Sequence, residues 1–271
     1  MLGLVRKSKA HMLSSLGLAS LTALAVSTAA AHTPYIAPTS FEPVMGKMAS
    51  FDASFSEEFF IPEAAFNKGN FKVTTPSGEV VNPDSKAELK TRIVLEHELK
   101  DEGTYRITTG ARHGATFLIY DLDGEEKRVM NPKEPAPKGA EVKNHFQSIT
   151  RADTYVSRKA PSNGALKVEA AGLQILPIDN PTELFADEEF ALKILLDNKG
   201  MAEQEILVYK ANQEKSKPVN FTTDKAGVAK LSLPAGKYLL RARYRGPAPE
   251  GSKVPTLSHT TTLSVQVFEN I

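Results

Sequence analysis

Short runs of β-branched and aromatic residues, separated by proline and glycine at close intervals, fill this 271-residue sequence after residue 31. The run Met48–Phe55 alternates between apolar and polar residues, as a half-buried strand does. Turn-forming residues, such as those of Thr223–Gly227, recur between the runs. Few stretches keep the 3.6-residue apolar period of a core helix. The sequence therefore predicts a mostly β fold.

Strands separated by turn signals at intervals of roughly ten residues are typical of β-sandwiches. We expect two such domains, immunoglobulin-like or transthyretin-like, at residues 32–130 and 165–271. Residues 131–164 are interpreted as a Pro-rich linker followed by a connecting strand. Tyr105 follows an acidic turn and a glycine, which predicts a tyrosine corner, and Gly236-Lys-Tyr238 repeats the step.

Asp121-Leu-Asp-Gly124 predicts a hairpin turn between strands at residues 115–120 and 127–130. Its acidic residues resemble part of a calcium loop, but the segment is too short and lacks the distal glutamate. A hairpin is therefore the favoured interpretation.

Residues 1–31 have the parts of a secretory signal. Three basic residues lie within the first nine positions, and an apolar stretch at 16–26 is too short to span a bilayer. Ala29 and Ala31 fit a small-x-small cleavage pattern. We expect cleavage after Ala31 and a soluble periplasmic protein. An uncleaved anchor, or cleavage a residue or two away, is the alternative.

Composition excludes several classes of function. The sequence has no cysteine, which removes disulfides, thiolate metal sites and thiol nucleophiles. Removing residues 1–31 leaves 30 basic against 32 acidic residues, so no basic excess favours nucleic acid. No Gly-rich phosphate loop follows a strand, and we expect no organic cofactor.

A series of turn motifs in the second half follows a familiar order. The start of the predicted mature chain, Ala31-His-Thr-Pro-Tyr-Ile-Ala-Pro38, agrees with it. Together they resemble the exported proteins labelled NikM-like or nickel-transport-associated, originally a domain of unknown function. The motifs are Gly172-Leu-Gln-Ile-Leu-Pro177, Asn180-Pro-Thr-Glu-Leu184, Thr223-Asp-Lys-Ala-Gly227 and Pro234-Ala-Gly-Lys-Tyr-Leu-Leu240.

The resemblance covers nearly the whole predicted mature chain. It implies a periplasmic protein of two β-sandwiches, associated with uptake of a transition-metal ion and with an inner- or outer-membrane metal transporter. The family commonly has an acidic residue after the histidine, where this chain has Thr33. The second half alone also resembles transthyretin-like and surface-adhesin repeat modules, a fold that serves many functions.

His32 is the first candidate metal ligand. Cleavage after Ala31 would make it the N-terminal residue, which offers both an α-amine and an imidazole nitrogen to nickel, cobalt or copper. Pro34 has no amide hydrogen, so it blocks a square-planar site built from successive deprotonated amides. What remains is an amine–imidazole chelate, completed by distant histidines.

His113 and His259 are the candidate partners of His32. His113 lies in a glycine-flanked turn, and His259 opens the last strand after a long loop. His97 stands between two glutamates, but on a strand it faces away from both of them. His145 lies in the connector and ranks lowest. Possible oxygen ligands are Asp52, Glu57, Glu58 and Asp153.

Catalytic motifs are sparse: the sequence has neither a Gly-x-Ser-x-Gly elbow nor a His-Glu-x-x-His helix. We therefore expect a metal-handling protein that is not an enzyme. Two alternatives stay open at this point. One is a structural or interaction module without metal, and the other is a copper oxidase that uses a histidine brace.

Overall fold

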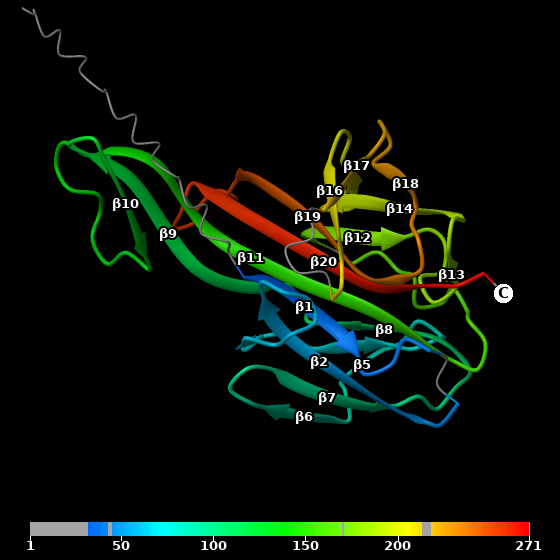
Figure 1. Ribbon diagram of the computed structural model, residues 1–271. Coiled ribbons are helices and arrows are strands. Elements are labelled where there is room, and N and C mark those ends of the chain that lie inside the picture. Colours follow the sequence, from blue (N-terminus) through cyan, green and yellow to red (C-terminus); the bar gives the residue numbers. More distant parts are fainter. Residues whose placement is uncertain (1–31, 43–44, 170, 213–217, 271) are drawn as a thin grey trace, which may run out of the picture. The chain divides into compact units, whose positions relative to one another are not determined.

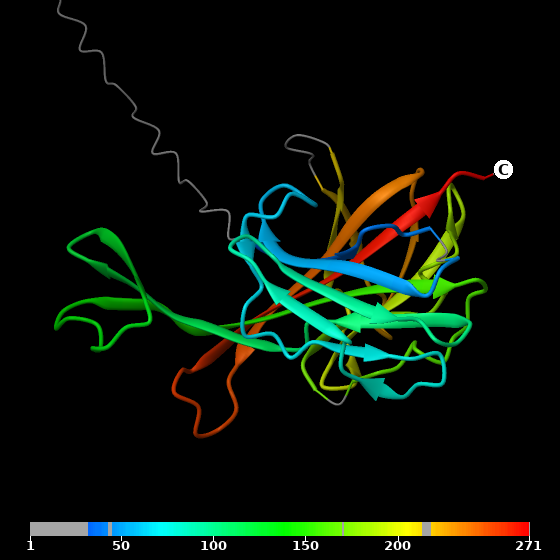
Figure 2. The ribbon, with the colours of Figure 1, turned by 90° about the horizontal axis from the view of Figure 1, so that it is seen from below.

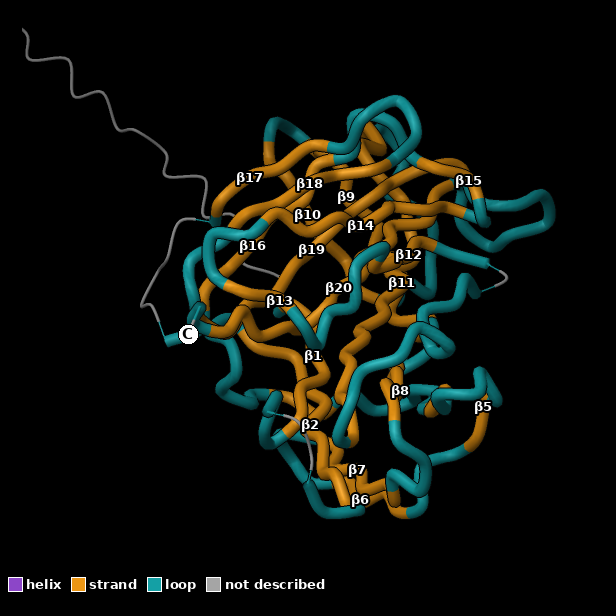
Figure 3. The backbone as a smooth tube through the Cα atoms, turned by 90° about the vertical axis from the view of Figure 1, so that its right-hand side faces the viewer, coloured by secondary structure: helices purple, strands orange, loops and turns teal. Residues whose placement is uncertain are grey.

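The computed structural model describes residues 32–42, 45–169, 171–212 and 218–270. The predicted signal segment, residues 1–31, lies outside them. The described residues form twenty strands and no helix, which confirms the mostly β fold class (Figure 3). They therefore include no helix long and apolar enough to span a membrane.

The strands form three sheets. The first has the order β1-β2-β7-β6, with β3 beside β2. The largest runs β17-β16-β19-β20-β11-β8-β4-β5 and also contains β9, β10 and β13. The third has β12, β14 and β15 in that order, with β18 beside β14. The bounds are β1 Thr33–Pro38, β2 Met48–Ser56, β3 Ala64–Ala65, β4 Lys72–Thr74, β5 Val80–Val81, β6 Ser85–Glu88, β7 Ile93–Glu98, β8 Gly103–Thr108, β9 Arg112–Leu122, β10 Glu125–Met130, β11 Glu141–Arg158, β12 Leu173–Pro177, β13 Leu184–Phe185, β14 Glu189–Leu196, β15 Lys199–Gly200, β16 Glu205–Lys210, β17 Val219–Thr222, β18 Val228–Ser232, β19 Gly236–Pro247 and β20 Thr256–Phe268.

The large sheet lies between the other two sheets and closes a sandwich on each side (Figure 1). Side chains alternate between its faces, so Ala152 and Val156 of β11 enter the first core, whereas Tyr155 enters the second. β11 pairs antiparallel with β8 and parallel with β20, which joins the two halves of the chain in one sheet. The two sandwich cores therefore belong to one unit, which begins at residue 31.

Both sandwiches close a corner with a tyrosine. The Tyr105 hydroxyl donates to the Asp101 carbonyl at 3.0 Å, and the Tyr238 hydroxyl donates to the Pro234 carbonyl at 2.7 Å. In each case a positive-φ glycine stands two residues before the tyrosine. The predicted corner at Tyr105 is confirmed, and the repeated step at Tyr238 has the same geometry.

β1 was not predicted, because two of its six residues are prolines. Proline is tolerated at a sheet edge where its nitrogen faces away from the neighbouring strand. β1 is such an edge, and β2 is its only partner among the described strands. The Pro34 carbonyl instead accepts a hydrogen bond from the Thr262 hydroxyl of β20 at 2.9 Å. This contact places β1 against the large sheet.

A projecting arm consists of β9, β10 and residues 141–148 of β11 (Figures 1 and 2). The predicted hairpin turn is confirmed: Leu122 pairs with Glu125, and both residues of the loop, Asp123 and Gly124, have positive φ. At the root of the arm, Phe117 stacks on Phe146 with ring centroids 5.2 Å apart. Beyond the root, most arm side chains are exposed or half-buried.

A buried ion cluster lies on the second-core face of the large sheet. Arg106 pairs with Asp153 at 3.1 Å, and Arg151 pairs with Glu169 at 2.6 Å. Arg106 also lies 3.4 Å from Glu169, which links the two pairs. Buried charges of this kind persist only when they are mutually compensated. The cluster ties β8 and β11 to the segment that precedes β12.

Candidate functional site

His32 lies immediately before β1, and its ring contacts Glu63. His32 Nε2 and Glu63 Oε2 are 3.0 Å apart, and the two side chains are 50% and 35% exposed. The other carboxylate oxygen of Glu63 accepts the Glu57 backbone N–H at 2.8 Å and the Ser56 hydroxyl at 3.1 Å. The Glu57 hydrogen bond is the main cause that lowers the pKa of Glu63. The carboxylate of Glu63 is therefore ionised and is fixed by two hydrogen bonds, so it can accept a hydrogen bond from the imidazole.

This contact selects one nitrogen of the His32 ring. With Nε2 directed at Glu63, Nδ1 is the ring nitrogen nearer the residue's own backbone nitrogen. An α-amine at His32 and Nδ1 would close a six-membered chelate ring on one metal ion. Metal-bound histidines typically donate their second ring N–H to a carboxylate, which orients the ring. The pair has the arrangement of such a ligand with its supporting carboxylate.

His113 and His259 lie on the same face of the large sheet. Ile149 of β11 is paired with His113 of β9 on one side and with His259 of β20 on the other. Tyr244 of β19 extends the row beyond His259, with ring centroids 6.5 Å apart. The two histidine Cα atoms are thus two strand spacings apart, or about 10 Å.

The His113–His259 pair lines a hollow of about 430 Å³, together with Asp197 and Tyr244. Burial lowers the pKa of His259, with Asp197 raising it and His113 lowering it further. A lowered pKa keeps the imidazole neutral near pH 7, and neutral imidazole is the form that binds metal. The hollow can accept an ion through two monodentate nitrogens.

The structure does not bring His32 to this pair. β1 contacts the large sheet at Thr262, whose side chain lies on the opposite face of β20 from His259. Thr33 likewise accepts a hydrogen bond from Arg241, on the same face as Thr262. Within the described ranges, no group of three or more His, Asp or Glu side chains is arranged to hold one ion. A single site with all three histidines is therefore absent there.

Three of the other six candidate residues have structural partners. His97 is buried and lies 3.2 Å from Asp84, while Glu96 on the same strand is exposed, so the predicted alternation is confirmed. Asp52 pairs with Arg92 at 3.3 Å. Asp153 belongs to the buried ion cluster. Of the remaining three, Glu57 and Glu58 are exposed, and His145 lies in the arm.

Sequence reasoning missed Glu63, the residue that contacts His32. It follows β2 by seven positions in a segment without a motif, Ile61-Pro-Glu63. The β2–β3 pairing returns the chain to Phe55 and so places Glu63 beside the start of β1, which pairs with the same strand. No sequence signal marks this contact, because it depends on two strand pairings.

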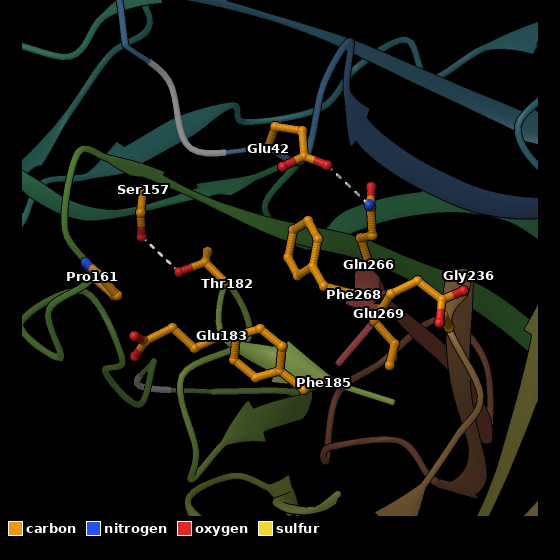
Figure 4. A pocket seen from close by; sticks show the side chains of 12 residues that line it. Glu42, Ser157, Pro161, Thr182, Glu183, Phe185, Gly236, Gln266, Phe268 and Glu269 are labelled. Atoms are coloured by element: carbon orange, nitrogen blue, oxygen red, sulfur yellow. Dashed lines mark hydrogen bonds between the residues drawn. The ribbon is translucent and has the colours of Figure 1, made fainter. Parts of the chain in front are cut away.

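A larger hollow, of about 720 Å³, lies where β13 meets the end of β20 (Figure 4). Phe185 and Phe268 line it, with ring centroids 6.3 Å apart. Carboxylates of Glu42, Glu183 and Glu269 stand around the rings. The hollow contains none of the predicted histidines. Its aromatic rings suit an apolar group.

These features define an all-β protein with two sandwich cores that share a sheet, and with histidines placed at its surface. The chain belongs to the family described as "Domain of unknown function (DUF4198)", which matches residues 29–246. No curated protein matches the sequence.

Solved structures that are similar to this chain include the following three. The D0–D1 domain of intimin is 11% identical over 86% of this chain and 97% of its own, with a TM-score of 0.21. Adhesin InvE of Yersinia pseudotuberculosis is 11% identical over 88% of this chain and 63% of its own, with a TM-score of 0.22. Murine CEACAM1b is 10% identical over 88% of this chain and 100% of its own, with a TM-score of 0.20.

Proposed function

We propose that the mature protein is periplasmic and binds a nickel, cobalt or copper ion, as an accessory to metal uptake. Cleavage after Ala31 would free the α-amine of His32, which then chelates the ion together with Nδ1 of the same residue. The resemblance of the turn motifs to the NikM-like proteins supports the uptake role. The partner on this view is a membrane metal transporter.

The contact between His32 Nε2 and Glu63 carries this proposal. It engages Nε2, which leaves Nδ1 to chelate with the amine, and it supplies the outer carboxylate that metal-bound histidines typically have. Glu63 is itself fixed by two hydrogen bonds, so the ring is oriented before an ion arrives. The pair His113 and His259 is a second, weaker position, because it offers two separate nitrogens without a chelate.

The test begins with the protein exported through its own signal and purified from the periplasm. N-terminal sequencing establishes whether His32 is the first residue, and calorimetric titration with Cu²⁺ and Ni²⁺ measures affinity. We expect His32→Ala to abolish the tight site. Glu63→Gln should weaken it by about 10–100-fold, the usual effect of losing an outer-shell partner.

His145→Ala, in the arm, is the matched control and should bind like the unmodified protein. Tight binding that survives His32→Ala but is lost in His113→Ala or His259→Ala would move the site to the second position. Absence of binding, with His32 verified as the N-terminus, would reject the proposal. Oxidation of ascorbate with turnover by the copper-loaded protein would favour the oxidase alternative instead.

A further inference from the structure

β10 is an open strand edge at the side of the projecting arm. Its only paired neighbour among the described strands is β9, and all six of its residues are exposed. β6 is also exposed throughout but has only four residues. An edge with free N–H and C=O groups is a template for pairing with another strand. The arm holds this edge away from the sandwiches (Figure 2).

The backbone phase of β10 determines which residues can pair. Asn131, directly after β10, donates its N–H to the Thr116 carbonyl of β9 at 2.8 Å. Peptide groups alternate in direction along a strand, so the odd-numbered residues face β9. Glu126, Arg128 and Met130 therefore present their N–H and C=O groups outward. When two strands pair antiparallel, a residue that directs its N–H and C=O groups toward the partner strand lies opposite a residue that does the same.

Charge then favours a register centred on Lys127 over those centred on Glu126 or Arg128 for pairing between two copies of β10. A two-fold axis at Glu126 would place the two Glu126 side chains opposite each other, and an axis at Arg128 would do the same for the two Arg128 side chains. An axis at Lys127 places Glu126 opposite Arg128 of the second copy, twice by symmetry. The two Lys127 side chains then meet on the other face, where each is already paired with Glu125 of its own chain.

The apolar end of β10 fits the same register. Met130 is 64% exposed and would lie opposite Gly124 of the second copy. Gly124 has no side chain, and the space beside its Cα is open. The methionine can therefore cover the backbone of the facing turn without a clash.

We propose that β10 pairs antiparallel with β10 of a second copy of this chain, centred on Lys127. The three-stranded sheet of each arm would then continue into that of the other. A contact of this size buries little surface, so the dimer is weak and forms as protein concentration rises. The dimer requires neither a metal ion nor His32, so it can fail or succeed independently of the proposed function.

Sedimentation velocity over a concentration series tests the pairing. We expect the unmodified protein to dimerise, and increasingly less as salt is added. Arg128→Glu and Glu126→Arg should each raise the dimer dissociation constant by at least about tenfold, because like charges would then face each other. The double variant Glu126→Arg/Arg128→Glu restores opposite charges in this register and should recover the dimer. Glu88→Arg, on the β6 edge, is the control.

Amide exchange by NMR supplies a second readout. In the dimer, the amides of Glu126 and Arg128 should gain protection, whereas that of Lys127, already bonded to β9, should change little. A monomer at every concentration would overturn the proposal. So would a dimer that Arg128→Glu leaves intact, or one that the double variant fails to recover.

Discussion

The two halves of β11 belong to one continuous strand but have opposite surroundings. Residues 141–148 belong to the arm and are mostly exposed or half-buried, whereas nine consecutive residues, 149–157, are buried. The buried half is not a hydrophobic run, since it contains Arg151 and Asp153. It is buried because a sandwich covers each face of it. The environment of a strand in this protein thus depends on what packs against the sheet more than on the strand's own composition.

The largest difference between the halves should come from charge. Asp153→Ala removes the carboxylate nearest to the buried Arg106, and we expect it to lower the free energy of unfolding by about 3–5 kcal/mol. Glu141→Ala, which removes an exposed ion pair with Lys143 in the arm, should cost far less, because solvent screens the pair. Urea denaturation measures both. Equal effects would show that the two halves are not energetically distinct.

Alkaline pH should weaken the buried half selectively. Burial is the main cause that raises the pKa of Tyr155, from 10.0 to about 12. The folded state therefore holds this proton more tightly than the unfolded state, and the resulting stability is present below pH 10 and lost as pH rises toward 12. The unmodified protein should lose about 2–3 kcal/mol more than Tyr155→Phe over this range.

Urea denaturation at a series of pH values gives that difference. Tyr120→Phe, in the arm, controls for the loss of one tyrosine. If Tyr155→Phe and the unmodified protein lose stability in parallel, the buried hydroxyl does not contribute.

The smallest expected difference in stability is between alanine substitutions at two valines of β11. Val156 is fully buried in the first core, and Val156→Ala should destabilise by about 2 kcal/mol through lost burial and a small cavity. Val142 is 51% exposed in the arm, and Val142→Ala should change stability by no more than about 0.5 kcal/mol. Thermal unfolding of both variants tests the comparison. A large effect at Val142 would indicate that the arm packs against something in solution.

Local sequence chemistry predicted much of this fold. The hairpin at Asp121–Gly124, the corner at Tyr105 and the alternation around His97 each depend on a few adjacent residues, and each is confirmed. β1 escaped prediction because Pro34 is acceptable only at an edge. Whether a strand is an edge depends on pairings between distant segments.

The candidate site divides in the same way. The residue types were visible in the sequence, which nominated His113 and His259 as partners of His32; the structure places these two histidines at one hollow, away from His32. Their separation from His32 was not visible, because it depends on which face of β20 each element contacts. Glu63 was missed for the same reason, since β2 must pair with both β1 and β3 to place it beside His32.

The sequence by itself determined the β class, the turns and the inventory of possible ligands, because periodicity, backbone restrictions and side-chain chemistry act over short distances. Only the tertiary structure decided that one sheet serves two cores, that Arg106 and Asp153 are buried together, and that His32 faces Glu63. Those outcomes arise from strand pairing and sheet packing between residues far apart in the chain. No local pattern encodes such contacts.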